Sequence, residues 1–379
     1  MKQPIRVLHV LGGLSLGGAE SRIMDLYRCM NRDEIQFDFL VHADDVDVRN
    51  PEFYDEEIKG LGGRIFILPK FKVYNIIAYR RAVKEFFKEN HEFAVVQGHM
   101  TSTASIYLPV AKKSGIATVA AHARSAGVDK GLKGFITRLL RRPLLHQADY
   151  CFACSREAGL SVFGKGWEKS GKAFVLPNAI LSEKYRFDER KREEIRRQLG
   201  VEACYVLGHV GRFHYAKNHE FLLRVFSEVH AQMRKSGKRA VLMLLGDGGG
   251  MDRAREQAAE LGLNSDILFM GNQGDVEHYY QGMDYFVFPS RFEGLPGTVV
   301  EAQAAGLRCV ISDRITQEVG FSELVHYESI DQSVKLWSEY ILSHAEYERV
   351  DMHRMVKEAG FDVREQAVAM TCFYQTGNM

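Results

Sequence analysis

The sequence is poor in proline and cysteine, and it contains no long apolar run. Its 379 residues include 8 prolines, with 46% hydrophobic and 26% charged residues, which excludes a long disordered or collagen-like chain. No stretch approaches the roughly 20 consecutive apolar residues that a helix needs to span a bilayer. Residues 1–4 lead into a strand pattern without a cleavable signal. We therefore expect a cytoplasmic protein, or a peripheral one on the inner face of the cell membrane.

The chain also lacks an excess of charge of either sign. Lys and Arg number 50 against 49 Asp and Glu, so the formal charge is +1 and no nucleic-acid partner is expected. A chain of this length needs no disulfides, and its six cysteines are typical of buried thiols in a reducing compartment. Cys151 and Cys154 form a C-x-x-C pair but lack the second pair of a zinc site, so no metal ligand is assigned.

Glycine, in contrast, is abundant, and short apolar runs alternate with helical patterns along the chain. This alternation is typical of α/β proteins with parallel sheets. We predict two Rossmann-like doubly wound domains that face a central cleft. The predicted strands are 5–11, 37–41, 64–68, 94–97, 118–122, 150–154 and 173–176, then 206–210, 239–245, 267–270, 285–289 and 309–312.

The charged segment 182–198 separates the two series of strands and is expected to be a solvated linker that runs into a helix. The predicted domains are therefore 1–181 and 182–361. The tail 362–379 has a helical pattern and no strand partner, so we expect it to pack back on the first domain.

Ligands of doubly wound folds bind outside the carboxyl ends of the strands. The first loop there, residues 12–20, has neither the G-x-G-x-x-G spacing of a dinucleotide fold nor the Lys-Ser/Thr of a P-loop. A dehydrogenase and an NTPase are thus disfavoured. Its four glycines permit a phosphate or sugar to approach closely, but a structural turn explains them equally well.

A second loop, 211–218, places Arg212 and Lys217 between a predicted strand and a predicted helix. Two cations beside a helix N-terminus are typical of a diphosphate site, because the helix dipole and the donors favour the same negative group. The alternative is a pair of solvated surface charges.

A third segment, 288–306, leaves a strand, turns on Gly and Pro, and enters a helix predicted at 299–305. Glu293 lies in the turn and Glu301 lies in the helix, with seven residues between them. Thr298 and Glu301 also fit a capping box, and Glu293 could be an exposed loop carboxylate.

These segments together resemble a known family. The spacing of Glu293 and Glu301 is similar to the Glu-x7-Glu motif of retaining glycosyltransferases of family 4. Segments 211–218, 245–248, 269–271 and 289–290 occur in that family's order, and 12–20 resembles bacterial exopolysaccharide-biosynthesis members. The resemblance covers nearly the whole chain and implies the type B fold, with a nucleoside-diphosphate sugar bound mainly to the second domain.

The resemblance also implies a role for each matching residue. Arg212 and Lys217 would hold the diphosphate, Glu301 would bind the ribose hydroxyls, and Glu293 would orient the transferred sugar. His122 would lie near the sugar C6 hydroxyl and the acceptor, and His99 is a second candidate; a structural role remains open for both histidines. The remaining donor-binding positions implied are Gly17, Gly18, Gly211, Gly271, Gly294 and Leu295.

The implied reaction is transfer of a hexose, with retention, to a saccharide or polyprenyl-linked acceptor in polysaccharide biosynthesis. UDP is the first guess over GDP, from family frequency. No Asp-x-Asp motif lies at a strand end with a phosphate-facing loop, so we expect transfer without a metal or other cofactor, with the leaving charge neutralised by protein cations. A sugar-nucleotide epimerase, another nucleotide-sugar-binding enzyme of the same fold, and a non-catalytic nucleotide-binding protein remain alternatives.

Segment 130–142 combines five basic residues with apolar positions at helical spacing. Such a helix could lie on an anionic membrane surface and admit a polyprenyl-linked acceptor. An ordinary amphipathic helix packed on its own domain explains the pattern equally well.

Overall fold

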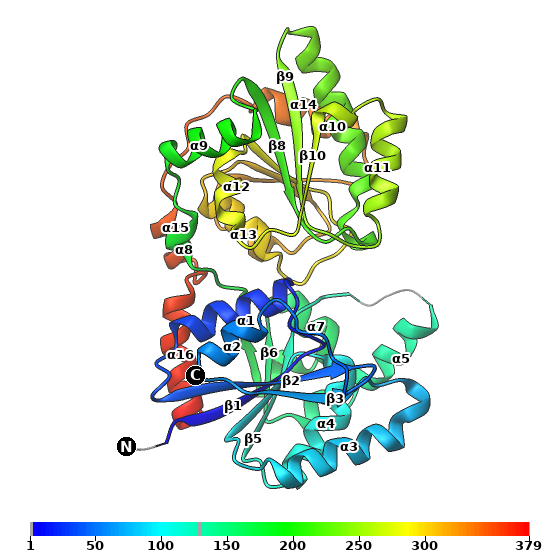
Figure 1. Cartoon of the computed structure of the whole chain (residues 1–379), viewed down its shortest axis with the longest axis vertical. Coiled ribbons are helices and arrows are strands. Elements are labelled where there is room, and N and C mark those ends of the chain that lie inside the picture. Colours follow the sequence, from blue (N-terminus) through cyan, green and yellow to red (C-terminus); the bar gives the residue numbers. More distant parts are fainter. Residues whose placement is uncertain (1–2, 128–130, 379) are drawn as a thin grey trace. The chain divides into compact units, whose positions relative to one another are not determined.

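The computed structural model describes residues 3–127 and 131–378, and of Lys133 it describes only the backbone. The chain forms two compact units, shown in Figure 1. The first contains the residues up to Asn178 together with those from Val363 onward, and the second contains Ala179–Asp362.

A parallel seven-stranded sheet forms the centre of the first unit, in the order β3-β2-β1-β4-β5-β6-β7. Helices cover its faces, so its inner strands are buried on both sides and read as continuous apolar runs. The direction of winding reverses between β1 and β4. The strands are β1 (Ile5–Val10), β2 (Ile35–Ala43), β3 (Ile65–Pro69), β4 (Val95–Gly98), β5 (Thr118–Ala123), β6 (Tyr150–Ala153) and β7 (Ala173–Val175).

The helices of this unit include the last one of the chain, which packs against the first. They are α1 (Gly18–Cys29), α2 (Asp55–Gly60), η1 (Val73–Asn75), α3 (Ile76–Glu89), α4 (Thr101–Lys113), α5 (Leu132–Arg141), α6 (Leu144–Gln147), α7 (Arg156–Phe163), η2 (Trp167–Lys169) and α16 (Val363–Thr376). The Tyr374 hydroxyl of α16 donates to Gln97 of β4, and the Tyr150 hydroxyl of β6 donates to the carbonyl of Gly377. Two hydrogen bonds therefore hold the C-terminal segment to the sheet.

The second unit has a parallel six-stranded sheet in the order β10-β9-β8-β11-β12-β13, and its winding reverses between β8 and β11. Its strands are β8 (Cys204–Val210), β9 (Arg239–Leu245), β10 (Ile267–Gly271), β11 (Tyr285–Phe288), β12 (Cys309–Ser312) and β13 (Val325–Glu328). Its helices are α8 (Ser182–Tyr185), α9 (Glu189–Leu199), η3 (Tyr215–Lys217), α10 (His219–Lys235), α11 (Met251–Glu260), η4 (Asn264–Asp266), α12 (Val276–Gly282), α13 (Gly297–Ala304), η5 (Gln317–Val319), α14 (Val334–Ser343) and α15 (His353–Glu358). A core around Trp337 and Phe226 joins α10 and α14 to the sheet.

Two doubly wound parallel sheets confirm the predicted fold class, and every predicted strand is present. β13 was not predicted, because its four residues are only half-buried and carry His and Glu at an edge of the sheet. The charges of 182–198 are not all solvated either. Arg192 and Arg196 both donate to the carboxylate of Asp284, which binds α9 to the start of β11. The cysteines also differ from expectation, since Cys372 is exposed and Cys29 is partly exposed.

None of the helices in the described ranges, 3–127 and 131–378, combines the length and the apolarity needed to cross a membrane.

Candidate active site

The loops that follow β8 and β11 flank the point where the second sheet reverses its winding. Ligands of doubly wound sheets bind at such a switch point. Both loops carry predicted site residues, and they are tied together: the backbone N–H of Arg291 donates to the carbonyl of Ala216, with 2.7 Å between N and O. Asn218, in the left-handed conformation (φ 59°), donates from its side chain to the carbonyl of Pro289. The two loops therefore form one structured surface.

Lys217 and Glu293 meet on this surface. Nζ of Lys217 lies 2.7 Å from Oε1 of Glu293, and the two side chains are only 18% and 16% exposed. The same ammonium lies 4.6 Å from the centre of the Phe288 ring, a cation–π contact. The structure thus excludes the interpretation of Glu293 as an exposed loop carboxylate. An ammonium has three donors and a carboxylate has two oxygens, so both groups retain capacity to bind a further polar group.

Arg212 lies one residue beyond Gly211 and is exposed. Within the part of the chain that the structure describes, its guanidinium makes no hydrogen bond or ion pair. Gly211 allows the Lys217 side chain to lie against the backbone, because a Cβ here would come within 3.2 Å of Cδ and Cε of Lys217. Two cations are therefore presented at the carboxyl end of β8, one paired with Glu293 and one not.

Gly271 belongs to the same set of loops through its carbonyl, which accepts from the N–H of Gly246 at 2.7 Å. Gly246 has φ of +129°, and a Cβ there would lie 2.3 Å from the carbonyl oxygen of Gly211, so only glycine fits. Backbone contacts therefore connect the loops after β8, β9 and β10 and bring Gly211, Gly246 and Gly271 to one edge of the sheet.

Glu301 does not form a capping box. Helix α13 begins at Gly297 with Pro296 as its N-cap, so Thr298 lies inside the helix, and there is no side-chain cap hydrogen bond. The Glu301 side chain is buried and accepts a hydrogen bond from the Tyr280 hydroxyl of α12, with 2.9 Å between the oxygens. Gly294 and Leu295, which precede the helix, are buried as well. A buried carboxylate held by a hydroxyl needs an explanation other than helix capping.

His122 and His99 lie at the carboxyl ends of β5 and β4 in the first unit, and both are buried. Their ring centres are 5.3 Å apart, and Nε2 of His99 lies 3.0 Å from Nδ1 of His9 on β1. Burial, followed by the nearby charge of Arg124, holds the pKa of both His99 and His122 well below the ordinary value. The same two causes lower the pKa of His9 to about 3. All three imidazoles are therefore neutral at physiological pH and can act there as hydrogen-bond groups.

Gly17 and Gly18 begin α1 at the end of the loop that follows β1. A Cβ on Gly18 would meet nothing within 4 Å, so the space beside it is open. The loop itself is anchored by Glu52, whose carboxylate accepts from the backbone N–H of Leu14 and pairs with Arg49 at 2.7 Å.

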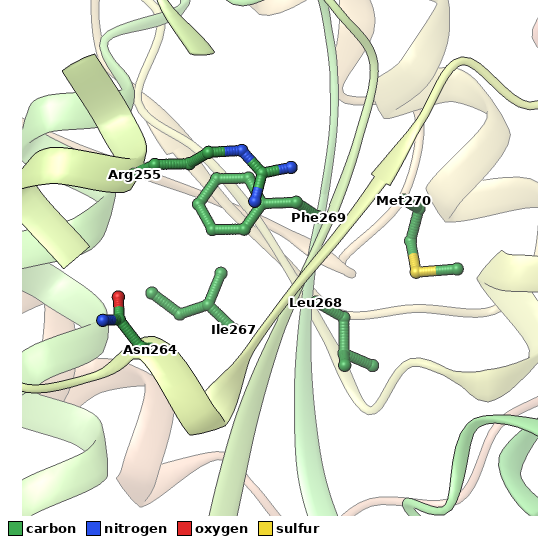
Figure 2. Close-up of a pocket in the computed structure, with 6 residues that line it drawn as sticks. All are labelled: Arg255, Asn264, Ile267, Leu268, Phe269 and Met270. Atoms are coloured by element: carbon green, nitrogen blue, oxygen red, sulfur yellow. The ribbon is translucent and has the colours of Figure 1, made fainter. Parts of the chain in front are cut away.

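A separate cavity of about 310 Å³ lies beside the edge strand β10 and is drawn in Figure 2. It is lined by Arg255, Asn264, Ile267, Leu268, Phe269 and Met270. The Arg255 guanidinium lies 4.2 Å from the centre of the Phe269 ring, over its face (Figure 2). None of the predicted site residues lines this cavity, and Arg255 is its only ionisable side chain, so we do not assign the site to it.

The structure brings Lys217 and Glu293 into contact, and it places Gly211, Gly271, Gly294, Leu295 and Glu301 on loops and a helix of the same unit. The residue patterns did not identify three hydrogen-bonding side chains. Tyr280 bonds to Glu301, Gln97 bonds to His122, and Tyr374 bonds to Gln97. Tyr280 and Tyr374 lie in helices distant in sequence from their partners, so no local pattern could have identified them. Of the three, only Gln97 could have been noticed in the sequence, because it lies two residues before His99.

Over residues 3–127 and 131–378, no group of three or more His, Cys, Asp or Glu side chains could hold a metal ion.

Two family descriptions match the chain. "Glycosyltransferase Family 4" matches residues 16–183, and "Glycosyl transferases group 1" matches residues 191–357. The first match covers mainly the first unit and the second match lies within the second unit, so each unit matches a glycosyltransferase description.

Individual proteins are similar to the chain in sequence or in fold. EpsF of Bacillus subtilis (strain 168), whose name describes a glycosyltransferase, is 35% identical over 97% of this chain and 96% of its own. The UDP-Gal:alpha-D-GlcNAc-diphosphoundecaprenol alpha-1,3-galactosyltransferase of Escherichia coli is 29% identical over 38% of this chain and 37% of its own. Anabaena HepE, solved in complex with UDP-glucose, shares the fold with a TM-score of 0.72 and 15% identity, over 97% of this chain and 99% of its own.

The similarity to EpsF along the whole chain, the two family matches and the two doubly wound sheets agree, and the chain therefore belongs to glycosyltransferase family 4 and has the type B fold.

Proposed function

We propose that this glycosyltransferase moves a hexose, with retention, from a UDP-sugar to a saccharide or polyprenyl-linked saccharide during polysaccharide assembly. The observation that carries the proposal is the Lys217–Glu293 pair at the switch point of the second sheet. The names of two relatives support the donor and the acceptor. HepE was solved with UDP-glucose, and the E. coli relative is named for a UDP-galactose donor and a diphosphoundecaprenol-linked acceptor.

In the proposed reaction the acceptor hydroxyl attacks C1 of the sugar on the face that the leaving diphosphate occupies. The bond from the acceptor oxygen to C1 forms, the bond from C1 to the phosphate oxygen breaks, and the acceptor proton passes to the leaving phosphate. The charge that develops on the phosphate is stabilised by Arg212 and Lys217. Because Lys217 and Glu293 together carry no net charge, Arg212 supplies the unbalanced positive charge at this edge.

Glu293 has two tasks in this scheme. Its Oε1 holds the ammonium of Lys217 in place, and its other oxygen accepts a hydrogen bond from a hydroxyl of the transferred sugar. Glu301, oriented by Tyr280, accepts from the ribose hydroxyls. In the first unit, His122 is assigned to the sugar C6 hydroxyl and the acceptor, and Gly17 and Gly18 are assigned to the donor.

Calorimetry with UDP, GDP and a panel of their sugars tests the donor, and incubation of the best donor with a polyprenyl-diphosphate saccharide tests transfer. We expect UDP-sugars to bind and a new α-linked product to form from an α-linked donor. Conversion of the donor to a stereoisomer without acceptor would instead identify an epimerase. Binding without any turnover would identify a nucleotide-binding protein.

We predict that the transfer does not need a divalent metal, because Arg212 and Lys217 neutralise the leaving group. Activity should survive dialysis against EDTA within about twofold, since no metal-dependent charge stabilisation is lost. Turnover measured before and after chelation checks this. Activity that disappears with EDTA and returns with Mn²⁺ would contradict the assignment of both cations.

Replacing Glu301 by Gln should weaken UDP binding by about 1.5–3 kcal/mol, the range for a hydrogen bond to a charged group. Replacing Tyr280 by Phe should cost less, about 0.5–1.5 kcal/mol, because only the orientation of Glu301 is lost. Calorimetry of UDP binding measures both, and thermal melting followed by circular dichroism shows whether α12 and α13 remain folded. Unchanged UDP affinity in both variants would remove Glu301 from the nucleotide site.

We further propose that α5 lies on an anionic membrane surface. Leu132, Phe135 and Leu139 share a face of this helix and are 75%, 58% and 51% exposed, whereas a helix packed on its own domain would bury them. Arg138 and Arg142 are exposed near them. Exposed Val73, Tyr74 and Ile77, which follow β3, add a second apolar group in the same unit.

Not all of the basic residues of segment 130–142 face outward. Arg141 donates to the Thr101 hydroxyl at 3.1 Å, and burial lowers its pKa, so it joins α5 to α4. Lys130 and the side chain of Lys133 lie outside the described residues. Tests of membrane binding should therefore keep Arg141 intact.

Liposome flotation with anionic lipid should detect binding that the variant Phe135→Ser, Leu139→Ser, Arg138→Gln, Arg142→Gln has lost. Each basic residue near a membrane surface contributes about 1 kcal/mol, so the two arginines alone predict a reduction of about 30-fold. A matched variant elsewhere in the same unit, Val368→Ser with Lys88→Gln, should float like the wild type. Equal flotation of all three proteins would contradict the proposal.

A further inference from the structure

The geometry points to a three-residue relay in the first unit, in which Tyr374 and Gln97 hold His122 as its Nε2–H tautomer and so present that N–H to the substrate. The inference rests on the proposed placement of His122 beside the transferred sugar. It assigns positioning roles to Gln97 and Tyr374, and it makes the C-terminal helix α16 part of the active-site structure.

The relay consists of two hydrogen bonds between residues distant in sequence. The hydroxyl of Tyr374 donates to Oε1 of Gln97, with 2.8 Å between the oxygens, and these residues are 277 positions apart. The amide Nε2 of Gln97 lies 3.1 Å from Nδ1 of His122. All three side chains are buried, so water does not compete for these hydrogen bonds.

The direction of the two hydrogen bonds determines the tautomer. An amide nitrogen is only a donor, so Nδ1 of His122 must accept with its lone pair, and the proton of the neutral ring must lie on Nε2. In the observed arrangement the hydroxyl of Tyr374 donates to the oxygen end of the amide, which leaves the nitrogen end facing His122. Without that hydroxyl, Gln97 could rotate and turn its oxygen to Nδ1, which would favour the opposite tautomer.

The proton on Nε2 then lacks a partner. Among the residues that the structure describes, Nε2 of His122 is buried and makes no hydrogen bond. A buried N–H without an acceptor is destabilising, and such groups are uncommon unless a ligand satisfies them. The neighbouring His99 cannot serve, because its Nε2 faces Nδ1 of His9 at 3.0 Å and its Nδ1 accepts from Nε of Arg124 at 3.4 Å. A hydroxyl oxygen of the transferred sugar is the kind of acceptor that this N–H requires.

The chain offers a matched control for Tyr374. The Tyr150 hydroxyl donates to the carbonyl of Gly377, at 2.7 Å, and so also fastens the C-terminal segment to the sheet. Tyr150 takes part in neither of the two hydrogen bonds of the relay. Tyr150→Phe therefore removes one anchor of this segment and leaves the relay intact, whereas Tyr374→Phe removes an anchor and the relay together.

The test measures the tautomer of His122 and the kinetics of sugar transfer in the same set of proteins. Histidine labelled with ¹⁵N reports the protonated ring nitrogen, and the His122 signals are assigned as those missing from His122→Ala. We expect Nε2–H in the wild type and in Tyr150→Phe. Gln97→Glu should move the proton to Nδ1, because a carboxylate accepts from it, and Tyr374→Phe should give a mixture of the two tautomers.

With the UDP-sugar that the calorimetric panel identifies, Gln97→Glu should lower kcat at least about 100-fold, the lower end of the range for losing one preorganised hydrogen-bond donor that acts in the transition state. Its KM should change no more than about twofold, since His122 is assigned to the reacting sugar and not to the nucleotide. Tyr374→Phe, the milder variant, should lower kcat in proportion to the lost Nε2–H fraction. Tyr150→Phe should match the wild type, and adding Gln97→Glu to His122→Ala should cause no further loss.

Two contrary results have different meanings. An Nδ1–H tautomer in the wild type, with His122→Ala still impaired, would overturn the relay and leave the proposed function standing. Full turnover by His122→Ala would overturn the placement of His122 at the substrate, and the inference with it. Equal kinetic losses in Tyr374→Phe and Tyr150→Phe, without a tautomer change, would show that α16 acts only as a structural support.

Discussion

Glutamine in place of Glu293 should lower kcat by about 10²–10³-fold, the loss typical of removing one preorganised electrostatic contact from a transition state. Two effects add. The transferred sugar loses the carboxylate that contacts it as its shape and charge change, and Lys217 loses the negative charge of the group that holds its ammonium 2.7 Å away. The affinity for free UDP should fall much less, because UDP contains no transferred sugar. Steady-state kinetics together with calorimetry of UDP binding measure the two effects separately.

Glu256→Gln is the matched control for this change, since Glu256 lies in the same unit in an exposed ion pair with Arg253. Exposed pairs of this kind contribute little, so the control should keep wild-type turnover and UDP affinity. If Glu293→Gln behaves like Glu256→Gln, the pair at the switch point has no catalytic role. The main support for the proposed site would then be lost.

Lys217→Gln should cause a loss of similar size, about 10²–10³-fold in kcat, but with a different pattern. It removes a cation that neutralises the leaving diphosphate, and it leaves the Glu293 carboxylate without its partner beside that negative group. We therefore expect weaker UDP binding as well, by about 1.5–3 kcal/mol. Lys238→Gln, which removes an exposed lysine paired with Glu346 at 3.6 Å, serves as the control.

The double variant Lys217→Gln, Glu293→Gln tests whether the two residues act together. Groups that act as a unit give effects that do not add, so the double variant should be little worse than the poorer single one. It should also regain part of the UDP affinity that Lys217→Gln loses, because no unpaired carboxylate remains. Fully additive losses would show that the ion pair is incidental and that each residue contacts the donor independently.

Much of the fold was predictable from local patterns. A buried parallel strand such as 206–210 is an apolar run, and the loop 211–218 that follows it carries glycine and charge. Both features depend only on neighbouring residues. The same is true of Glu293 and Glu301, whose spacing is visible on one turn and one helix. β13 escaped prediction because this edge strand is only half-buried and need not be apolar.

The sequence by itself thus determined the fold class, the family and the loops that carry the site. Only the tertiary structure decided which of these loops meet. The strand order β10-β9-β8-β11 places Lys217 against Glu293, 76 residues away, and the packing of α12 and α16 brings Tyr280 to Glu301 and Tyr374 to Gln97. It also decided between helix capping and a buried carboxylate for Glu301. The physical reason is that local periodicity reflects which face of an element is buried, whereas contacts between distant side chains depend on how whole elements are ordered and packed.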